Sequence, residues 1–274
     1  MGRFVTRIIL LVTGIQLTVT AFADGEADVL KDWIIERTEY SAVLQDHTVV
    51  AVTNHFGDIR VRTSNDDMIS IFAITQRHIK DVIKSQIQID SVENTLQIAV
   101  KYPSQADNKD ANHINDIDIT NRRVDISLLI PKYATLSMNT IDGRIESKGH
   151  LGPIQAKTDS GQVILVTRGP VNVSSDDGPI TITFKNDKWS APSSVESSTG
   201  KIHVLFIENP DINVEMQTAG TITTDYSVEI SNNIPASAQK QATARIGKAT
   251  HQLKIKSSLG PVILSRIFNM MKSN

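Results

Sequence analysis

Four aspartates could carry acid–base chemistry, because one local phrase places each of them in a turn just before a glycine. They are Asp142, Asp159, Asp176 and Asp177. Two carboxylates held together can act as acid and base, or as nucleophile, in the cleavage of polysaccharides. Turns also favour Asp, Asn and Ser for reasons of backbone geometry alone, and later copies of the phrase carry Thr199, Ala219 and Leu259 at this place. We therefore assign the aspartates to a binding surface and predict no catalytic residue.

Histidines and one polar segment are the other candidates for ligand chemistry, and neither matches a known metal motif. The chain has seven histidines, none of which forms an HExxH pair. His203 lies between Ile202 and Val204, so strand alternation predicts that its side chain points outward. The segment from Asp107 to Asp116 is rich in oxygen ligands but lacks the spacing and the closing glutamate of a calcium loop, which favours an exposed loop. We expect no metal and no cofactor.

Four arginines in two predicted strands could form a basic patch. They are Arg60, Arg62, Arg122 and Arg123. Charged side chains on strands commonly keep the exposed faces and edges of a sheet from associating. We expect that role for all four, with their side chains at the surface.

The elements that position the aspartates are predicted from an internal repeat. A polar turn, a glycine, one further residue and a β-branched residue recur from Gly143 to Gly220 at intervals of 18, 17, 22 and 20 residues. A second turn phrase, such as Gly152-Pro153-Ile154, falls between the copies. Each period therefore holds two turns and two short strands. We attribute the glycines to the positive φ of tight turns, and the prolines to the first position of a strand, where no N–H is needed.

Units this short cannot bury an apolar face alone, but stacked units can. We predict an all-β, single-domain β-solenoid (β-helix-like) of short two-strand coils with terminal caps, less regular over residues 24–139 and regular over residues 140–265. A sandwich or barrel of short strands is the alternative. The apolar residues expected to point inward and stack are Ile145, Val163, Ile180, Ile202, Ile222 and Val262.

Outside the regular repeats, the patterns are less uniform. Alternation predicts strands at residues 48–63, 68–75, 86–90, 95–102 and 122–130. Residues 104–115 have the composition of a loop, and residues 235–249 are expected to form a loop or a partial helix. One end of the stack is expected to be covered by a short helix that begins at Asp28 and carries Val29, Leu30, Trp33 and Ile34. The other end is expected to be covered by Ile267, Phe268, Met270 and Met271.

The first 23 residues have the pattern of a signal peptide. Arg3 and Arg7 precede an apolar run from Ile8 to Val19, and Ala21-Phe22-Ala23 gives a signal-peptidase site. The run is shorter than the roughly 20 apolar residues of a transmembrane helix, although an uncleaved N-terminal anchor is the alternative. We therefore expect a mature chain of residues 24–274, without a transmembrane segment, in the periplasm, at the cell surface or outside the cell.

Composition narrows the class of partner. Removal of two arginines with the signal peptide takes the formal net charge from -2 to -4. This mild acidity argues against nucleic acid or anionic lipid as the main partner. The chain contains no cysteine, which excludes disulfides, thiol catalysis and cysteine-bound metals. An envelope protein or a polysaccharide is the partner that fits these observations.

The order of these motifs resembles a bacterial family of exported adhesin-like proteins with a single β-solenoid domain. The resemblance rests on residues 49–61, residues 122–131, the glycine array that begins at Gly143, and residues 253–262. It covers most of residues 48–265. The resemblance implies a right-handed or similar β-helix and an extracytoplasmic location, and it brings no catalytic residues. Likeness at the level of the fold does not establish function.

Three functions follow as hypotheses. The first is a non-enzymatic envelope protein with a binding or adhesion-like role toward a protein or a polysaccharide. The second is a polysaccharide hydrolase or lyase, which requires the four aspartates to share one cleft. The third is a structural or assembly protein that associates through an end or an edge of its sheets.

Overall fold

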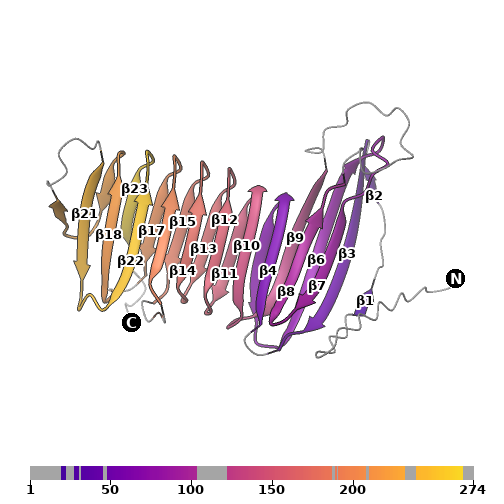
Figure 1. The fold of residues 1–274 in the computed structure, drawn as a ribbon, viewed down its shortest axis with the longest axis horizontal. Helices are drawn as coiled ribbons and strands as arrows, with labels where there is room; N and C mark the ends of the chain where they lie inside the picture. The colour runs from indigo at the N-terminus through magenta and orange to yellow at the C-terminus, as the bar shows by residue number, and fades with distance from the viewer. Residues whose placement is uncertain are drawn as a thin grey trace, which may run out of the picture.

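The protein is all-β in the part of the chain that its computed structural model describes. That part comprises residues 20–22, 28–30, 32–45, 48–103, 122–186, 189, 191–207, 210–231 and 239–267. It contains two large sheets, one of 12 and one of 11 strands, and both mix parallel and antiparallel pairs. The strands of both sheets follow one another along the longest axis of the molecule (Figure 1). No helix in these residues is long and apolar enough to cross a membrane.

The central strands alternate between the two sheets. They are β10 (Thr135–Asp142), β11 (Ile145–His150), β12 (Ile154–Thr158), β13 (Val163–Thr167), β14 (Val171–Ser175), β15 (Ile180–Phe184), β16 (Ser193–Ser197) and β17 (Ile202–Phe206). Even-numbered members of this series belong to the 11-stranded sheet and odd-numbered members to the 12-stranded sheet. From β12 onward, each strand of the series pairs in parallel with the strand two places earlier. We call two consecutive strands, one in each sheet, a level.

The levels at both ends do not follow the order of the sequence. The additional levels are β4 (Val49–Phe56) with β5 (Ile59–Ser64), β8 (Thr95–Lys101) with β9 (Arg123–Pro131), β18 (Ile212–Thr218) with β19 (Ile222–Thr224), and β22 (His251–Ser257) with β23 (Val262–Arg266). The β8/β9 level lies outside β4/β5, which then contacts β10/β11. At the other end, β22/β23 is inserted between β16/β17 and β18/β19. The expected N-terminal strands are therefore confirmed, and their neighbours are set by pairing across the chain.

Antiparallel strands cover both ends of the stack. They are β1 (Thr20–Phe22), β2 (Asp28–Leu30), β3 (Trp33–Val43), β6 (Met68–His78), β7 (Gln86–Val92), β20 (Glu229–Ser231) and β21 (Lys240–Ile246). β3 and β6 extend the larger sheet beyond β9, β7 closes one end of the smaller sheet, and β21 and β20 close the other.

Three expectations about the ends are wrong. The predicted helix at Asp28 is instead β2 and β3, because the exposed edge of β6 offers backbone partners to all 11 residues of β3. The segment predicted as a loop or partial helix contains β21, whose inward residues include Ala242 and Ala244, a weak apolar signal. Ile267 donates its N–H to Phe206 O, so it follows an inner level and does not cover the last one. The other three residues of that expected cap, and residues 104–115, lie outside the described residues.

The predicted inward residues are confirmed. The four from Ile145 to Ile202 in the array, together with Val262, have side chains that are 0% exposed, and Ile222 on the last level is partly buried. The reason for the glycines differs from the prediction. A Cβ at Gly161 would lie 1.7 Å from Gly143 O, and the same close approach recurs along the array. No glycine of the array has a φ in the left-handed region; Gly57, in the equivalent turn between β4 and β5, has a φ of 128°. Close packing of adjacent turns therefore selects glycine in the array.

Candidate binding site on the turn edge

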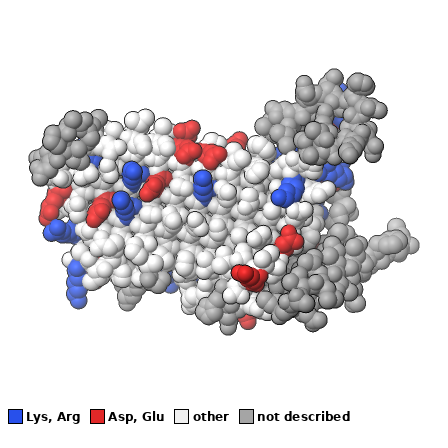
Figure 2. Space-filling model, in the orientation of Figure 1, with Lys and Arg blue, Asp and Glu red and all other residues white. Residues whose placement is uncertain are grey.

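The structure brings the four predicted aspartates together along one edge of the stack. Asp142 ends β10, Asp159 follows β12, and Asp176 and Asp177 follow β14, and all four are exposed. The turns are joined by main-chain hydrogen bonds: Asp177 N donates to Asp159 O at 2.8 Å and Ser160 N to Ile141 O at 3.1 Å. Neighbouring levels are therefore separated by the strand spacing of about 4.8 Å. Figure 2 shows acidic side chains gathered over these turns.

Hydroxyl side chains link the carboxylates between levels. Thr199 Oγ1 donates to Asp177 Oδ1 at 2.6 Å, and Ser160 Oγ lies 3.5 Å from Asp142 Oδ1. Beyond Thr199 the inserted level brings Leu259, which is 65% exposed, and its N–H bonds to Ser198 O at 2.8 Å. The acidic row is therefore limited to three consecutive turns and ends in hydroxyl and apolar residues. We call these turns the turn edge.

A column of buried polar side chains lies directly beneath the turn edge, at the ends of the strands that precede the turns. The residues that precede the turns are Asn54, Thr140, Thr158, Ser175, Ser197 and Ser257, and all are at most 7% exposed. Thr158 illustrates their role: its Oγ1 accepts the N–H of Gly161 at 3.0 Å and lies 3.5 Å from Ile141 O on the preceding level. The Thr140 and Ser197 hydroxyls lie 3.5 Å from carbonyl oxygens of neighbouring turns, His55 O and Asp176 O, whereas the buried hydroxyls of Ser175 and Ser257 have no hydrogen-bond partner among the described residues. The column therefore ties some of the turns to their neighbours through backbone groups.

An aromatic group adjoins the turn edge next to Asp142. Register places Phe56 beside Asp142. The rings of His55 and Tyr102 stack at 6.1 Å, and Phe56 meets Tyr102 edge-on at 5.3 Å. The Tyr102 hydroxyl lies 2.6 Å from Asn54 Oδ1 and 2.7 Å from Phe56 O, and burial raises its pKa. His55 is exposed, so at its Asp142 end the acidic row adjoins an accessible aromatic side chain.

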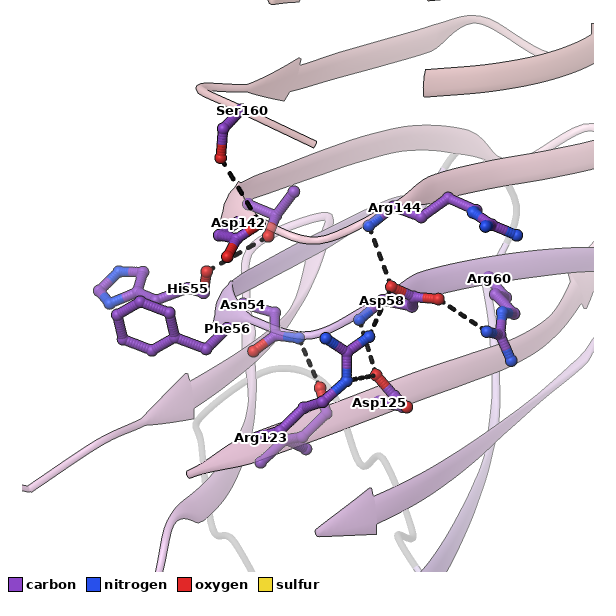
Figure 3. A network of polar contacts seen from close by, with 12 residues as sticks. Asn54, His55, Phe56, Asp58, Arg60, Arg123, Asp125, Asp142, Arg144 and Ser160 are labelled. Carbon is purple, nitrogen blue, oxygen red and sulfur yellow. Dashed lines mark hydrogen bonds and ion pairs between the residues drawn. The ribbon is translucent and has the colours of Figure 1, made fainter. Parts of the chain in front are cut away.

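Beneath this corner, Asp58 connects three neighbouring strands (Figure 3). Its Oδ1 accepts the N–H of Arg144 at 3.0 Å and Arg123 Nη2 at 2.7 Å, and its Oδ2 accepts Arg60 Nη2 at 2.7 Å. Burial raises the pKa of the Asp58 carboxyl, but the Arg144 N–H and the charges of Arg123 and Arg60 outweigh burial and lower that pKa below its ordinary value. Asp125 Oδ1 accepts the N–H of Asp58 at 2.8 Å. The network fixes the β4–β5 turn, which directly follows His55 and Phe56 at the end of β4.

One member of the predicted surface patch is buried. Arg122 is 1% exposed and Asp81 is 2% exposed. Arg122 donates through Nε and Nη2 to the two carboxylate oxygens of Asp81, and through Nη1 to Pro103 O. The expectation of a surface position for Arg122 is therefore wrong, because its partner lies 41 residues earlier in the sequence and no local pattern reveals it. Arg60, Arg62 and Arg123 are at the surface as expected.

The remaining candidates are the histidines and the polar segment from Asp107 to Asp116. His203 is on the outward face of β17, as predicted, with Nε2 3.1 Å from Ser265 Oγ. Within the described ranges, no three His, Asp or Glu side chains are arranged to hold a metal ion. The segment from Asp107 to Asp116 and His47 lie outside the described residues. Sequence reasoning missed Tyr102 and Asp58, although the Phe-Gly-Asp order after Asn54 marks the same turn phrase as the array.

Comparisons with known proteins give distant similarities. No protein-family model matches the sequence, and no protein of curated function matches it. The structure of a proposed cell adhesion protein from Clostridium sporogenes aligns with 84% of this chain and 100% of its own, at 12% identity and a TM-score of 0.39. That of a proposed adhesin from Bacteroides fragilis aligns with 87% of this chain and 98% of its own, at 11% identity and a TM-score of 0.25. At TM-scores this low, neither similarity defines the fold or the function of this chain.

Proposed function

We propose that the protein is a single-domain β-solenoid, exported to the cell envelope, that binds a protein or polysaccharide partner at its turn edge and catalyses no reaction. The alternation of parallel strands between two sheets supports the solenoid. The signal-peptide pattern of the first 23 residues supports export. An adhesion-like role is the form of binding that suits a rigid stack with a repeated surface.

The exposed row of aspartates is the observation that carries the proposal. Asp142, Asp159, Asp176 and Asp177 lie on three consecutive turns that share backbone hydrogen bonds. The backbone of the row is therefore pre-organised, so little loop entropy is lost when a partner binds. Carboxylates at strand spacing, flanked by the hydroxyl of Thr199 and the ring of His55, can accept hydrogen bonds from repeated donors such as sugar hydroxyls or lysine ammonium groups.

The alternative of a polysaccharide hydrolase or lyase is less well supported. Glycoside hydrolysis needs a general acid whose pKa is raised by an apolar environment, opposite a second carboxylate. All four aspartates are exposed at the rim of the stack, so they provide acceptors but are not enclosed by apolar side chains. An assembly role through the sheet ends is the other alternative, and the three-residue strands β19 and β20 at one end would be its contact.

The test is a thermal-shift and titration screen of residues 24–274 against envelope polysaccharide fragments. A ligand at 100 times its Kd should stabilise the protein by about 2.7 kcal/mol. The variant Asp159→Asn/Asp176→Asn/Asp177→Asn should lose that stabilisation and keep its own unfolding midpoint.

The matched control is Asp66→Asn/Asp90→Asn/Glu93→Gln, which removes three exposed acids away from the turn edge. Equal binding by both variants would refute the turn edge as the binding surface. Turnover of a glycan that is lost in Asp176→Asn would replace binding by catalysis. Concentration-dependent association without any ligand would favour assembly.

A further inference from the structure

A second charged surface lies on the outer face of the larger sheet. β9, β5 and β11 are adjacent parallel strands, and register places Arg60 between Ser127 and Glu146, and Arg62 between Leu129 and Lys148. Their inward neighbours include Ile59, Val61, Ile126 and Ile145, which are 0% exposed. Alternation therefore places the charged residues on the opposite face. We call this surface the arginine face; its cations are Arg60, Arg62, Arg123, Arg144 and Lys148.

The arginine face exposes its cations and covers its carboxylates. The side chains of Arg60, Arg62, Arg123 and Lys148 are 46%, 47%, 44% and 49% exposed, whereas those of Asp58 and Glu146 are both 10% exposed. Each of these two carboxylates pairs with two cations. Asp58 contacts Arg60 and Arg123 at 2.7 Å, and Glu146 contacts Arg62 at 2.5 Å and Lys148 at 2.8 Å. Asp58 and Glu146, which we call the carboxylate support, therefore lie beneath the cations and orient them toward solvent.

The local balance of charge is opposite to that of the whole chain. Five cations stand against Asp58, Asp125 and Glu146, whereas the chain as a whole has a net charge of -2. The Arg144 side chain is exposed and forms no ion pair with the described residues, while its backbone N–H binds Asp58. Hydrogen bonding to Lys148 lowers the pKa of Glu146, so the carboxylate support stays ionised well below neutral pH. The surface therefore attracts anions.

An exposed aromatic ring lies beside the cations. Phe72 on β6 is 42% exposed, and register places it opposite Ser127, whose other neighbour is Arg60. Phe72 and Arg60 are thus two strands apart, about 10 Å, while Arg60 and Arg62 are about 7 Å apart along β5. An aromatic ring packs against the C–H face of a sugar, and guanidinium groups bind carboxylate or sulfate in a fork. These distances suit neighbouring residues of one acidic chain.

We propose that the outer face of β5, β9 and β11 is a second binding site, distinct from the turn edge, for an acidic polysaccharide. The carboxylate or sulfate groups of the polymer bind Arg60, Arg62 and Arg144, and one sugar ring lies on Phe72. A sugar polymer fits better than nucleic acid, because single-stranded nucleic acid requires several aromatic platforms along a strongly basic groove. The site does not depend on the four aspartates of the turn edge.

The test is titration of the full mature chain with polygalacturonate, a heparin fragment and neutral dextran. The variant Arg60→Gln/Arg62→Gln leaves Asp58 paired with Arg123 and Glu146 paired with Lys148, so the fold should persist. It should weaken binding by roughly tenfold or more, as should Phe72→Thr, and added salt should weaken binding of the unmodified protein. Arg144→Gln breaks no ion pair and gives an independent check. Preference for polygalacturonate identifies a uronate ligand, and preference for heparin a sulfated one.

The control Lys254→Gln/Lys256→Gln removes the same charge from exposed positions on the smaller sheet and should leave binding unchanged. Equal weakening by this control would show non-specific attraction and overturn the proposal. Equal binding to dextran, tighter binding to a DNA oligonucleotide or to anionic vesicles, or no binding at all would also overturn it. If only the turn-edge variant lost binding, the acidic polysaccharide would bind at the turn edge, and the second site would be refuted. If instead the turn-edge variant kept its binding of all ligands, the proposal for the arginine face would still stand.

Discussion

Substitution of Arg122 by methionine should destabilise the protein far more than its position in a charged strand suggests. The guanidinium satisfies both oxygens of Asp81 and the carbonyl of Pro103, and both ends of the ion pair are at most 2% exposed. Methionine fills much of the volume but leaves the Asp81 carboxylate buried with the N–H of Ile83 at 3.1 Å as its remaining side-chain hydrogen bond. Removing one partner of a buried ion pair typically costs about 3–5 kcal/mol. For a chain of this length that is a fall in Tm of roughly 6–20 °C.

Urea unfolding followed by circular dichroism measures this loss. The midpoint should fall without a change in slope, since the surface exposed on unfolding is unchanged. Arg123→Met is the matched control, because Arg123 is the next residue and its side chain is 44% exposed. Asp58 keeps Arg60 and the Arg144 N–H as partners, so the loss should be about 0–1 kcal/mol, as for a surface ion pair. The double variant Arg122→Met/Asp81→Asn should be more stable than the sum of its single changes predicts, because it leaves no unpaired charge. A loss below about 1 kcal/mol for Arg122→Met, or strict additivity in the double variant, would refute the reasoning.

Three further predictions concern pH, packing and the order of the levels. Burial lowers the pKa of His150 to about 4, so below pH 6.5 the unfolded state takes up a proton that the folded state does not. Stability should therefore fall by about 3 kcal/mol as the pH drops from 6.5 to 4, and His150→Gln should remove this part of the loss in urea titrations at pH 7 and 4.5. Gly161→Ala should cost about 1–3 kcal/mol or more, because its Cβ would lie 1.7 Å from a backbone oxygen that no side-chain rotation can move; an unchanged urea midpoint would contradict this. Truncation before His251 removes the level between β17 and β19, so protease should cleave within residues 207–246; protection of that segment would show that β18/β19 can pack directly on β16/β17.

Local sequence was sufficient to predict the strands of the repeat and their inward side chains. Alternation and turn residues act over a few positions, so Ile145 and Val163 could be assigned to a buried column, and His203 to the outer face, without knowledge of the neighbours. The same local rules placed the four aspartates in equivalent turns. Stacking of equivalent turns then puts them in one row, and no longer-range information is required.

The roles of individual polar residues depended on partners that are distant in the sequence. Arg122 resembled a surface residue because its partner Asp81 belongs to the connection after β6. Tyr102 contacts Phe56, which is 46 residues earlier in the sequence. Asp58 is bound by Arg123 of β9 and by the N–H of Arg144, the residue before β11. The glycines of the array were located from sequence, but their cause, the approach of one turn to the next, is a contact between levels.

The sequence by itself determined an all-β chain of short alternating strands with an acidic row on its turns, because these features depend on residues a few positions apart. Only the tertiary structure decided the order of the levels, with β8/β9 outside β4/β5 and β22/β23 inserted before β18/β19. The physical reason is that every level presents the same backbone ladder and a similar apolar column to both of its neighbours. The local pattern is therefore compatible with many orders of the levels. The side chains and end strands of the whole stack select one of these orders.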